Sequence, residues 1–191
     1  MEAGRHAALL LMDLQRGIVD RFAGEDPGYL ARIGTVAAAA RRADIPVIWV
    51  VVRFRSGFPE VSPRNRMFGA IAARGALAEG DAAAEIHPAI AVEPQDLVVA
   101  KRRVSAFAGS DLEVVLRARG IDSLVLAGIA TGGVVLSTLR QAADMDFDLT
   151  VLADGCLDAD AEVHRVLLER VFPRQAAVTT VAAWAEALAP S

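Results

Sequence analysis

The feature that most constrains this chain is a set of short runs that are apolar from end to end. Six such runs are separated by stretches that have the spacing of amphipathic helices. Strands that are apolar throughout are buried on both faces, as in a parallel sheet that has helices on either side. The pattern therefore predicts a doubly wound α/β domain with a parallel six-stranded sheet and helices on both faces.

The expected strands and helices alternate along the chain. Strands are expected at residues 7–12, 47–52, 97–100, 123–129, 149–153 and 176–180. Helices are expected at residues 29–43, 111–119, 133–146, 161–171 and 182–189, with a short one near residues 67–74. The interval between residues 53 and 96 is rich in proline, glycine and arginine. A long irregular segment of this kind is typical of a lid or a binding loop.

Length and composition indicate a single folded domain over residues 1–191. The apolar fraction of 54% and the charged fraction of 23% exclude intrinsic disorder. The net charge of −4 argues against a nucleic-acid partner. The strongest apolar run, residues 45–52, is too short to span a membrane and no signal peptide is recognised, so we expect a cytoplasmic protein. The many apolar residues also suggest a homo-oligomer.

Polar residues stand where the first three expected strands end. Asp13 follows the first strand, Arg53 the second and Lys101 the third. In an open parallel sheet these ends meet at the edge where ligands bind. Lys101 is the only lysine among 20 basic residues, and a lysine can lose its proton when buried whereas an arginine stays charged. We expect Asp13 and Lys101 to lie within about 4 Å, as an acid–base pair or as an ion pair that ties two strand ends together.

A glycine-rich turn, residues 128–135, joins the fourth strand to the following helix. Its small residues allow close backbone approach, and the N–H groups of the helix N-terminus can hold an oxyanion. The turn lacks the spacing of a phosphate-binding loop, of a dinucleotide fingerprint or of a serine nucleophile elbow. We therefore expect no nucleotide cofactor. The alternative to an oxyanion-binding turn is an ordinary glycine-rich connection between a strand and a helix.

Three regions of the chain resemble the motifs of the isochorismatase-like hydrolases. They are residues 11–15 (Leu-Met-Asp-Leu-Gln), 101–107 (Lys-Arg-Arg-Val-Ser-Ala-Phe) and 127–131 (Ala-Gly-Ile-Ala-Thr). The superfamily includes nicotinamidases, N-carbamoylsarcosine amidohydrolases and isochorismatases. The resemblance runs over nearly the whole chain, and it implies a six-stranded parallel sheet, a hydrolytic activity and self-association.

The resemblance also implies catalytic residues. In the amidase members an Asp, a Lys and a Cys form a triad, and the first two correspond to Asp13 and Lys101. The nucleophile of the family stands three residues after the Thr of the turn, where this chain has Val134, and a valine cannot attack a carbonyl carbon. A cis peptide bond between Ile129 and Ala130 is implied as well, with the N–H groups of Ala130 and Val134 directed at an oxyanion.

Isochorismatases within the superfamily also lack the cysteine, and they use the Asp as an acid on an enol ether with water as the nucleophile. We therefore expect a hydrolase in which Asp13 transfers the proton and Lys101 adjusts the pKa of the Asp13 carboxyl. Two alternatives stay open: a catalytically silent binding or assembly protein, and an amide hydrolase with a displaced nucleophile. The single cysteine, Cys156, is expected beyond the fifth strand, and the hydroxyls of Thr131 and Ser137 are weak candidates.

The candidate substrate contacts lie beside these motifs and in the irregular segment. They are Gln15, Arg53, Phe54, Phe107 and Thr131. Residues 53–66 contain four arginines and one glutamate, which suits a small, anionic, partly apolar substrate. A solvated loop or a subunit contact is the alternative for this segment.

No metal is expected. Some family amidases bind a metal through an Asp-x-His pair after the second strand, where this chain has Arg-Phe-Arg at residues 53–55. The three acidic residues and one histidine within residues 158–164 are better explained as favourable charge at a helix N-terminus.

Overall fold

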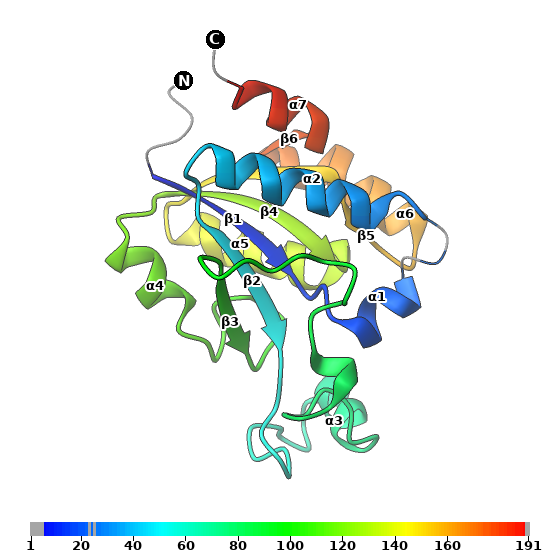
Figure 1. Ribbon diagram of the computed structural model, residues 1–191. Helices are drawn as coiled ribbons and strands as arrows, with labels where there is room; N and C mark the ends of the chain where they lie inside the picture. Colours follow the sequence, from blue (N-terminus) through cyan, green and yellow to red (C-terminus); the bar gives the residue numbers. More distant parts are fainter. Residues whose placement is uncertain (1–5, 23, 25, 190–191) are drawn as a thin grey trace.

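The computed structural model describes residues 6–22, 24 and 26–189, which fold around one sheet (Figure 1). Its strands are β1 (Ala7–Met12), β2 (Val47–Val52), β3 (Leu97–Lys101), β4 (Ser123–Ile129), β5 (Asp148–Leu157) and β6 (Ala177–Thr179). All neighbouring strands run parallel, in the order β3-β2-β1-β4-β5-β6. The predicted six-stranded parallel α/β class is confirmed.

The strand order reverses between β1 and β4. The chain first builds outward from β1 to β3, and then outward on the other side from β4 to β6. Open parallel sheets bind ligands at the carboxyl ends of the strands, beside such a reversal. A ligand site is therefore expected beside the residues that follow β1 and β4.

Helices cover both faces of the sheet (Figure 1). One face carries α2 (Tyr29–Arg42) and α7 (Val181–Ala187), and the other carries α4 (Leu112–Ala118), α5 (Leu136–Asp144) and the π-helical turn η4 (Leu167–Val171) that continues α6 (Ala161–Val166). Successive side chains of β1 pack on opposite faces of the sheet, because side chains alternate along a strand. Leu9 packs toward α2 and Leu10 packs toward α5. No helix among the described residues is long and apolar enough to cross a membrane.

Three short elements lie beyond the carboxyl ends of the strands. They are α1 (Arg16–Phe22), α3 (Arg66–Ala72) and the 3-10 helix η2 (Ala82–Ala84), and Figure 1 shows α1 and α3 past the arrowheads of β1 and β2. The long segment after β2 is thus folded over a small core of its own rather than irregular. That core consists of Val52, Phe54, Phe68, Leu77 and Ala84.

The structure corrects the expected end of the fifth strand. β5 does not stop at residue 153 but continues to Leu157, so Cys156 lies within the strand, opposite Gly128. The pairing of β4 with β5 shifts register between Leu126 and Gly128, which lets the strand bend and continue. The expected helix at residues 133–146 likewise begins earlier, with the π-helical turn η3 (Thr131–Val135), and ends at Asp144 in α5.

Candidate active site

Asp13 and Lys101 meet beyond the carboxyl ends of β1 and β3, although β2 lies between these two strands. Lys101 Nζ is 3.0 Å from Asp13 Oδ2, which confirms the predicted proximity. The lysine side chain is 2% exposed and the aspartate side chain 10%. Lys101 Nζ also donates hydrogen bonds to the carbonyl oxygens of Arg103 and Val104, each at 3.0 Å. Its three donors therefore all have acceptors.

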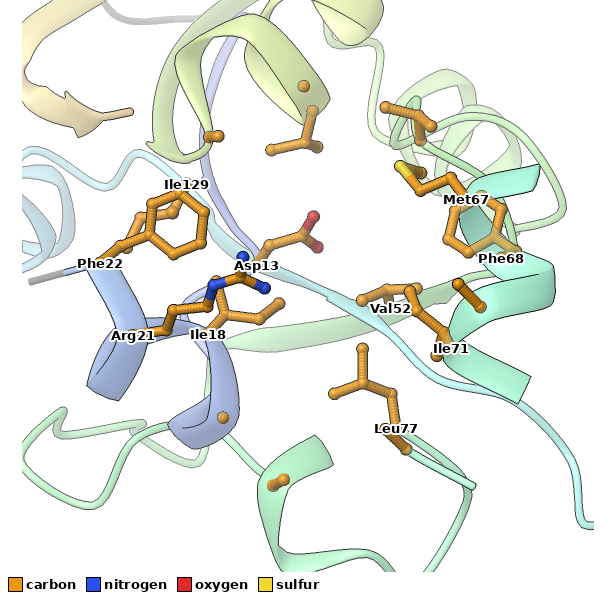
Figure 2. Close-up of a pocket in the computed structure, with 18 of the residues that line it drawn as sticks. Asp13, Ile18, Arg21, Phe22, Val52, Met67, Phe68, Ile71, Leu77 and Ile129 are labelled. Carbon is orange, nitrogen blue, oxygen red and sulfur yellow. The ribbon is translucent and has the colours of Figure 1, made fainter. Parts of the chain in front are cut away.

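The backbone turns sharply at Asp13. This residue has a φ of 58°, in the left-handed region that few residues other than glycine adopt, although aspartate tolerates it better than most. Its backbone N–H still donates to Val50 O at 2.8 Å, as a continuation of the sheet. The carboxyl is therefore held at the strand end by a rigid backbone, and Figure 2 shows it directed toward the centre of the cavity.

The two carboxyl oxygens of Asp13 have different surroundings. Oδ2 accepts from Lys101, whereas the buried Oδ1 has no hydrogen-bond partner among the described residues. Burial raises the pKa of the Asp13 carboxyl, and the attraction of the Lys101 ammonium opposes part of this rise. A carboxyl that keeps its proton to a higher pH, and that has one unpartnered oxygen, is suited to proton transfer.

The cavity above this pair has a volume of about 550 Å³ and mostly apolar walls (Figure 2). Its charged lining residues are Asp13, Lys101, Arg21 and Arg74. Its larger apolar lining residues are Ile18, Phe22, Val52, Met67, Phe68, Ile71, Leu77, Val104, Ile129 and Val134. A concave, largely apolar cavity with a few convergent polar groups is typical of a small-molecule site.

The turn after β4 forms one wall of this cavity. The Ile129–Ala130 peptide bond is cis, as the resemblance implied. Ala130 and Val134, the two residues expected at an oxyanion, both line the cavity. Gly128 has a φ of 144°, and a Cβ there would lie 2.2 Å from Met12 O. Only glycine fits this close approach of β4 to β1.

None of the five expected substrate contacts lines the cavity. Gln15 is fully buried and braces the end of β2, because its side chain exchanges hydrogen bonds with both the N–H and the carbonyl of Val52 and donates to Ala84 O. Thr131 Oγ1 donates to Leu157 O at 3.1 Å and lies 2.8 Å from His164 Nδ1. These two polar side chains hold the backbone around the site.

The other three expected contacts have partners elsewhere. Arg53 pairs with Glu85 at 3.1 Å. Phe54 is fully buried in the small core under α3. Phe107 belongs to the core under α4 and α5. None of these three side chains lines the cavity, because each one fills a core or pairs with a nearby carboxylate.

The sequence did not reveal the lining residues that α1 and α3 supply. Ile18, Arg21 and Phe22 occupy positions i, i+3 and i+4 of α1, which is the spacing of one helix face. This spacing could have indicated a helix with one face toward the cavity, but seven residues are too few for a clear helical pattern in the sequence. Arg74 follows α3 by two residues, and nothing in its local sequence marks it.

Neither a displaced thiol nor a metal cluster accompanies the cavity in the described part of the chain. Cys156 is buried within β5, outside the cavity lining, and burial raises the pKa of its thiol to about 12. No three His, Cys, Asp or Glu side chains of the described residues are grouped closely enough to hold a metal ion. Asp160 caps α6 by accepting from the N–H groups of Glu162 and Val163.

The dyad, the turn after β4 and the strand order accompany a match to a known family. The model of the isochorismatase domain matches residues 7–183. The chain belongs to the isochorismatase family. Isochorismatase-family relatives include the uncharacterized protein YecD of Escherichia coli O157:H7, which is 35% identical over 177 residues that cover 91% of this chain and 92% of YecD.

The chain is also similar to an amidohydrolase and to a solved structure of the family. The ureidoacrylate amidohydrolase RutB of Methylobacterium radiotolerans is 34% identical, over 94% of this chain and 78% of RutB. The structure of an isochorismatase family protein from Burkholderia thailandensis superposes with a TM-score of 0.83 at 31% identity, over 97% of this chain and 96% of that one.

Proposed function

We propose that this protein is a hydrolase that acts on a small carboxylated molecule by acid–base chemistry, without a metal and without a cysteine nucleophile. The observation that supports this proposal is the environment of the Asp13 carboxyl. Its carboxyl is buried at the floor of the cavity with a raised pKa, Oδ2 is held by Lys101, and Oδ1 has no partner among the described residues. Such a group can deliver a proton to a bound substrate.

An enol ether is the substrate class that this chemistry fits. Asp13 gives its proton to the terminal alkene carbon, and the alkene electrons form the new C–H bond. The ether carbon is then an oxocarbenium ion, and the carboxylate left on Asp13 is stabilised by Lys101. Water adds to that carbon and returns a proton to Asp13. The hydroxyl of the resulting hemiketal loses its proton and forms the C=O bond as the C–O bond to the leaving oxygen breaks, and the leaving oxygen takes up a proton, so that substrate and water become a ketone and an alcohol.

Covalent amide hydrolysis is less well supported. Val134 lines the same cavity as the dyad and has no nucleophilic atom. Cys156 lies outside the cavity with a pKa of about 12, so it is a thiol rather than a thiolate near neutral pH. Thr131 lies outside the lining too, and its hydroxyl donates to Leu157 O. Ser137 does not line the cavity either, so each displaced candidate lacks access or activation.

A catalytically silent binding protein is the second candidate, and Val134 favours it. Val134 puts methyl groups on the cavity wall, at the position that the motif resemblance assigns to the nucleophile of the amidases. A relative from Arabidopsis thaliana, 27% identical over 98% of this chain and 99% of its own length, is named "Probable inactive nicotinamidase At3g16190". In this alternative the cavity binds a ligand without converting it.

The test is a substrate panel of enol ethers, amides and imides, each with and without a carboxylate. We expect turnover of a carboxylated enol ether that falls at least about 100-fold in Asp13→Asn. Lys101→Arg is expected to impair turnover more than Arg102→Lys, because Arg102 contacts Glu60 outside the cavity. Ligand binding with no turnover across the panel would favour the silent binding protein.

A further inference from the structure

The proposed acid–base step leaves two charged groups of the cavity unused. Arg21 projects from α1, and Arg74 lies just beyond α3. We propose that these two arginines bind the carboxylate of an otherwise apolar substrate, and that they thereby present its other end to Asp13. This inference rests on the proposed function for the reaction, but the carboxylate binding itself is independent of turnover.

The charges of the cavity lining favour the binding of an anion. The Asp13–Lys101 pair, with 3.0 Å between its charged groups, adds no net negative charge whether Asp13 is ionised or protonated, so the two arginines leave the lining with a net positive charge. The whole chain has a net charge of −4, which makes this concentration of positive charge local to the cavity. Apolar walls lower the local dielectric constant and so strengthen the attraction of an anion.

The difference in burial between the dyad and the two arginines sets the orientation of a bound substrate. Asp13 and Lys101 are buried, whereas Arg21 and Arg74 are exposed. The dyad therefore lies at the floor and the arginines lie toward the mouth. Figure 2 shows the Arg21 side chain directed from α1 over the cavity, and its guanidinium carbon lies 5.7 Å from the centroid of the Phe22 ring, which helps to orient it.

A carboxylate is the anion that this arrangement favours. A guanidinium presents two parallel N–H donors to a carboxylate, and two arginines from different elements can engage one carboxylate from two sides. Between mouth and floor the walls are apolar, with Ile18, Phe22 and Met67 among them. The substrate class is thus a carboxylate on an apolar ring or branched chain, small enough for a cavity of about 550 Å³.

Two of the four arginines that the sequence suggested for this task pair with carboxylates elsewhere, and the other two, Arg64 and Arg66, do not line the cavity. Arg53 pairs with Glu85 and Arg55 with Glu60, and neither lines the cavity. The proposed anion-binding role therefore moves from residues 53–66 to Arg21 on α1 and Arg74 just beyond α3.

Benzoate and benzamide are suitable probes, because they share a ring and differ in charge. Isothermal titration calorimetry of the wild-type protein is expected to show benzoate binding at least about tenfold tighter than benzamide. Arg21→Gln and Arg74→Gln should each weaken benzoate binding by about tenfold and leave benzamide binding unchanged, and Arg21→Lys should restore part of the loss.

Matched controls come from the same two helices. Arg16, on α1, pairs with Asp20 outside the cavity, and Arg66 begins α3 outside it. Arg16→Gln and Arg66→Gln should bind both probes as the wild type does. Asp13→Asn should keep the preference for benzoate even though it strongly lowers turnover, which separates this inference from the proposed function. Failure of benzoate to bind, equal binding of both probes, or equal losses in the control variants would overturn the inference.

Discussion

At the dyad, the lysine and the aspartate differ in how completely they are bonded. Lys101 Nζ lies 3.0 Å from each of three acceptors, Asp13 Oδ2 and the carbonyl oxygens of Arg103 and Val104. A compact ammonium fits among three acceptors at this distance, whereas a planar guanidinium is larger and places its donors differently. This explains why the only lysine of an arginine-rich chain stands here.

The raised pKa of Asp13 predicts the direction of the pH dependence. The protonated carboxyl is the acid of the proposed step, and burial keeps that proton to a higher pH than in an exposed aspartate. As the pH rises through this pKa the acid is lost, so kcat/KM for the enol ether should fall. Measurement from about pH 4 to about pH 9 checks this. Asp13→Asn should lack this pH limb, and a rate that rises with pH would contradict Asp13 as the acid.

Val134 allows a second test at the same scale. Val134→Cys places a thiol on the cavity wall near Lys101, where positive charge favours the thiolate, whereas Cys156 is buried with a pKa of about 12. Native protein treated with iodoacetamide and analysed by mass spectrometry should therefore show one modification in the variant and none in the wild type. Modification of the wild type at Cys156 would show that the thiol in β5 is accessible after all.

Among the elements, the junction of β4 with η3 depends most on a single residue. β1 and β4 are neighbours on either side of the reversal in strand order, and Gly128 brings the β4 backbone against Met12 at the end of β1. The cavity wall formed by Ala130 and Val134 follows directly. The position of this wall relative to Asp13 is therefore set by how closely two strand ends approach.

Gly128→Ala should lower the free energy of unfolding by about 3 kcal/mol, because its Cβ would meet Met12 O at 2.2 Å and its φ of 144° disfavours a side chain. Gly34 in α2 is the matched control, with no atom within 4 Å of the added Cβ. Gly34→Ala should raise stability by about 0.5–1 kcal/mol through helix propensity. Urea denaturation of both variants measures the difference, and equal effects would refute the packing argument.

At the scale of the whole molecule, exposed apolar side chains support the proposal that the protein self-associates. Val98, on the edge strand β3, is 51% exposed, and Val114, on α4, is 69% exposed. Edge strands also present unpaired backbone groups that a second chain can use.

Light scattering at micromolar concentration should therefore give at least twice the chain mass of 20.1 kDa. Charged substitutions Val98→Lys and Val114→Glu should lower the measured mass if these surfaces form the interface. A mass of one chain for the wild type would refute self-association.

The sequence by itself determined the order and class of the elements around the sheet. Each strand is encoded by a local run of apolar residues, and the runs of β1, β2 and β4 are buried on both faces as predicted, whereas the edge strands β3 and β6 are partly exposed. The meeting of Asp13 with Lys101 could be predicted for the same reason, because parallel strands end at one edge of the sheet.

Only the tertiary structure decided which side chains line the cavity. The short helix α1 is supported by close packing, since a Cβ on Gly17 would lie 2.8 Å from Ala83 Cβ in η2, some 66 residues away in the chain. Gln15 turns toward Val52 and away from the cavity, whereas Arg21 reaches it. The direction of a side chain depends on partners that are distant in sequence, and a local pattern records the strand but not those partners.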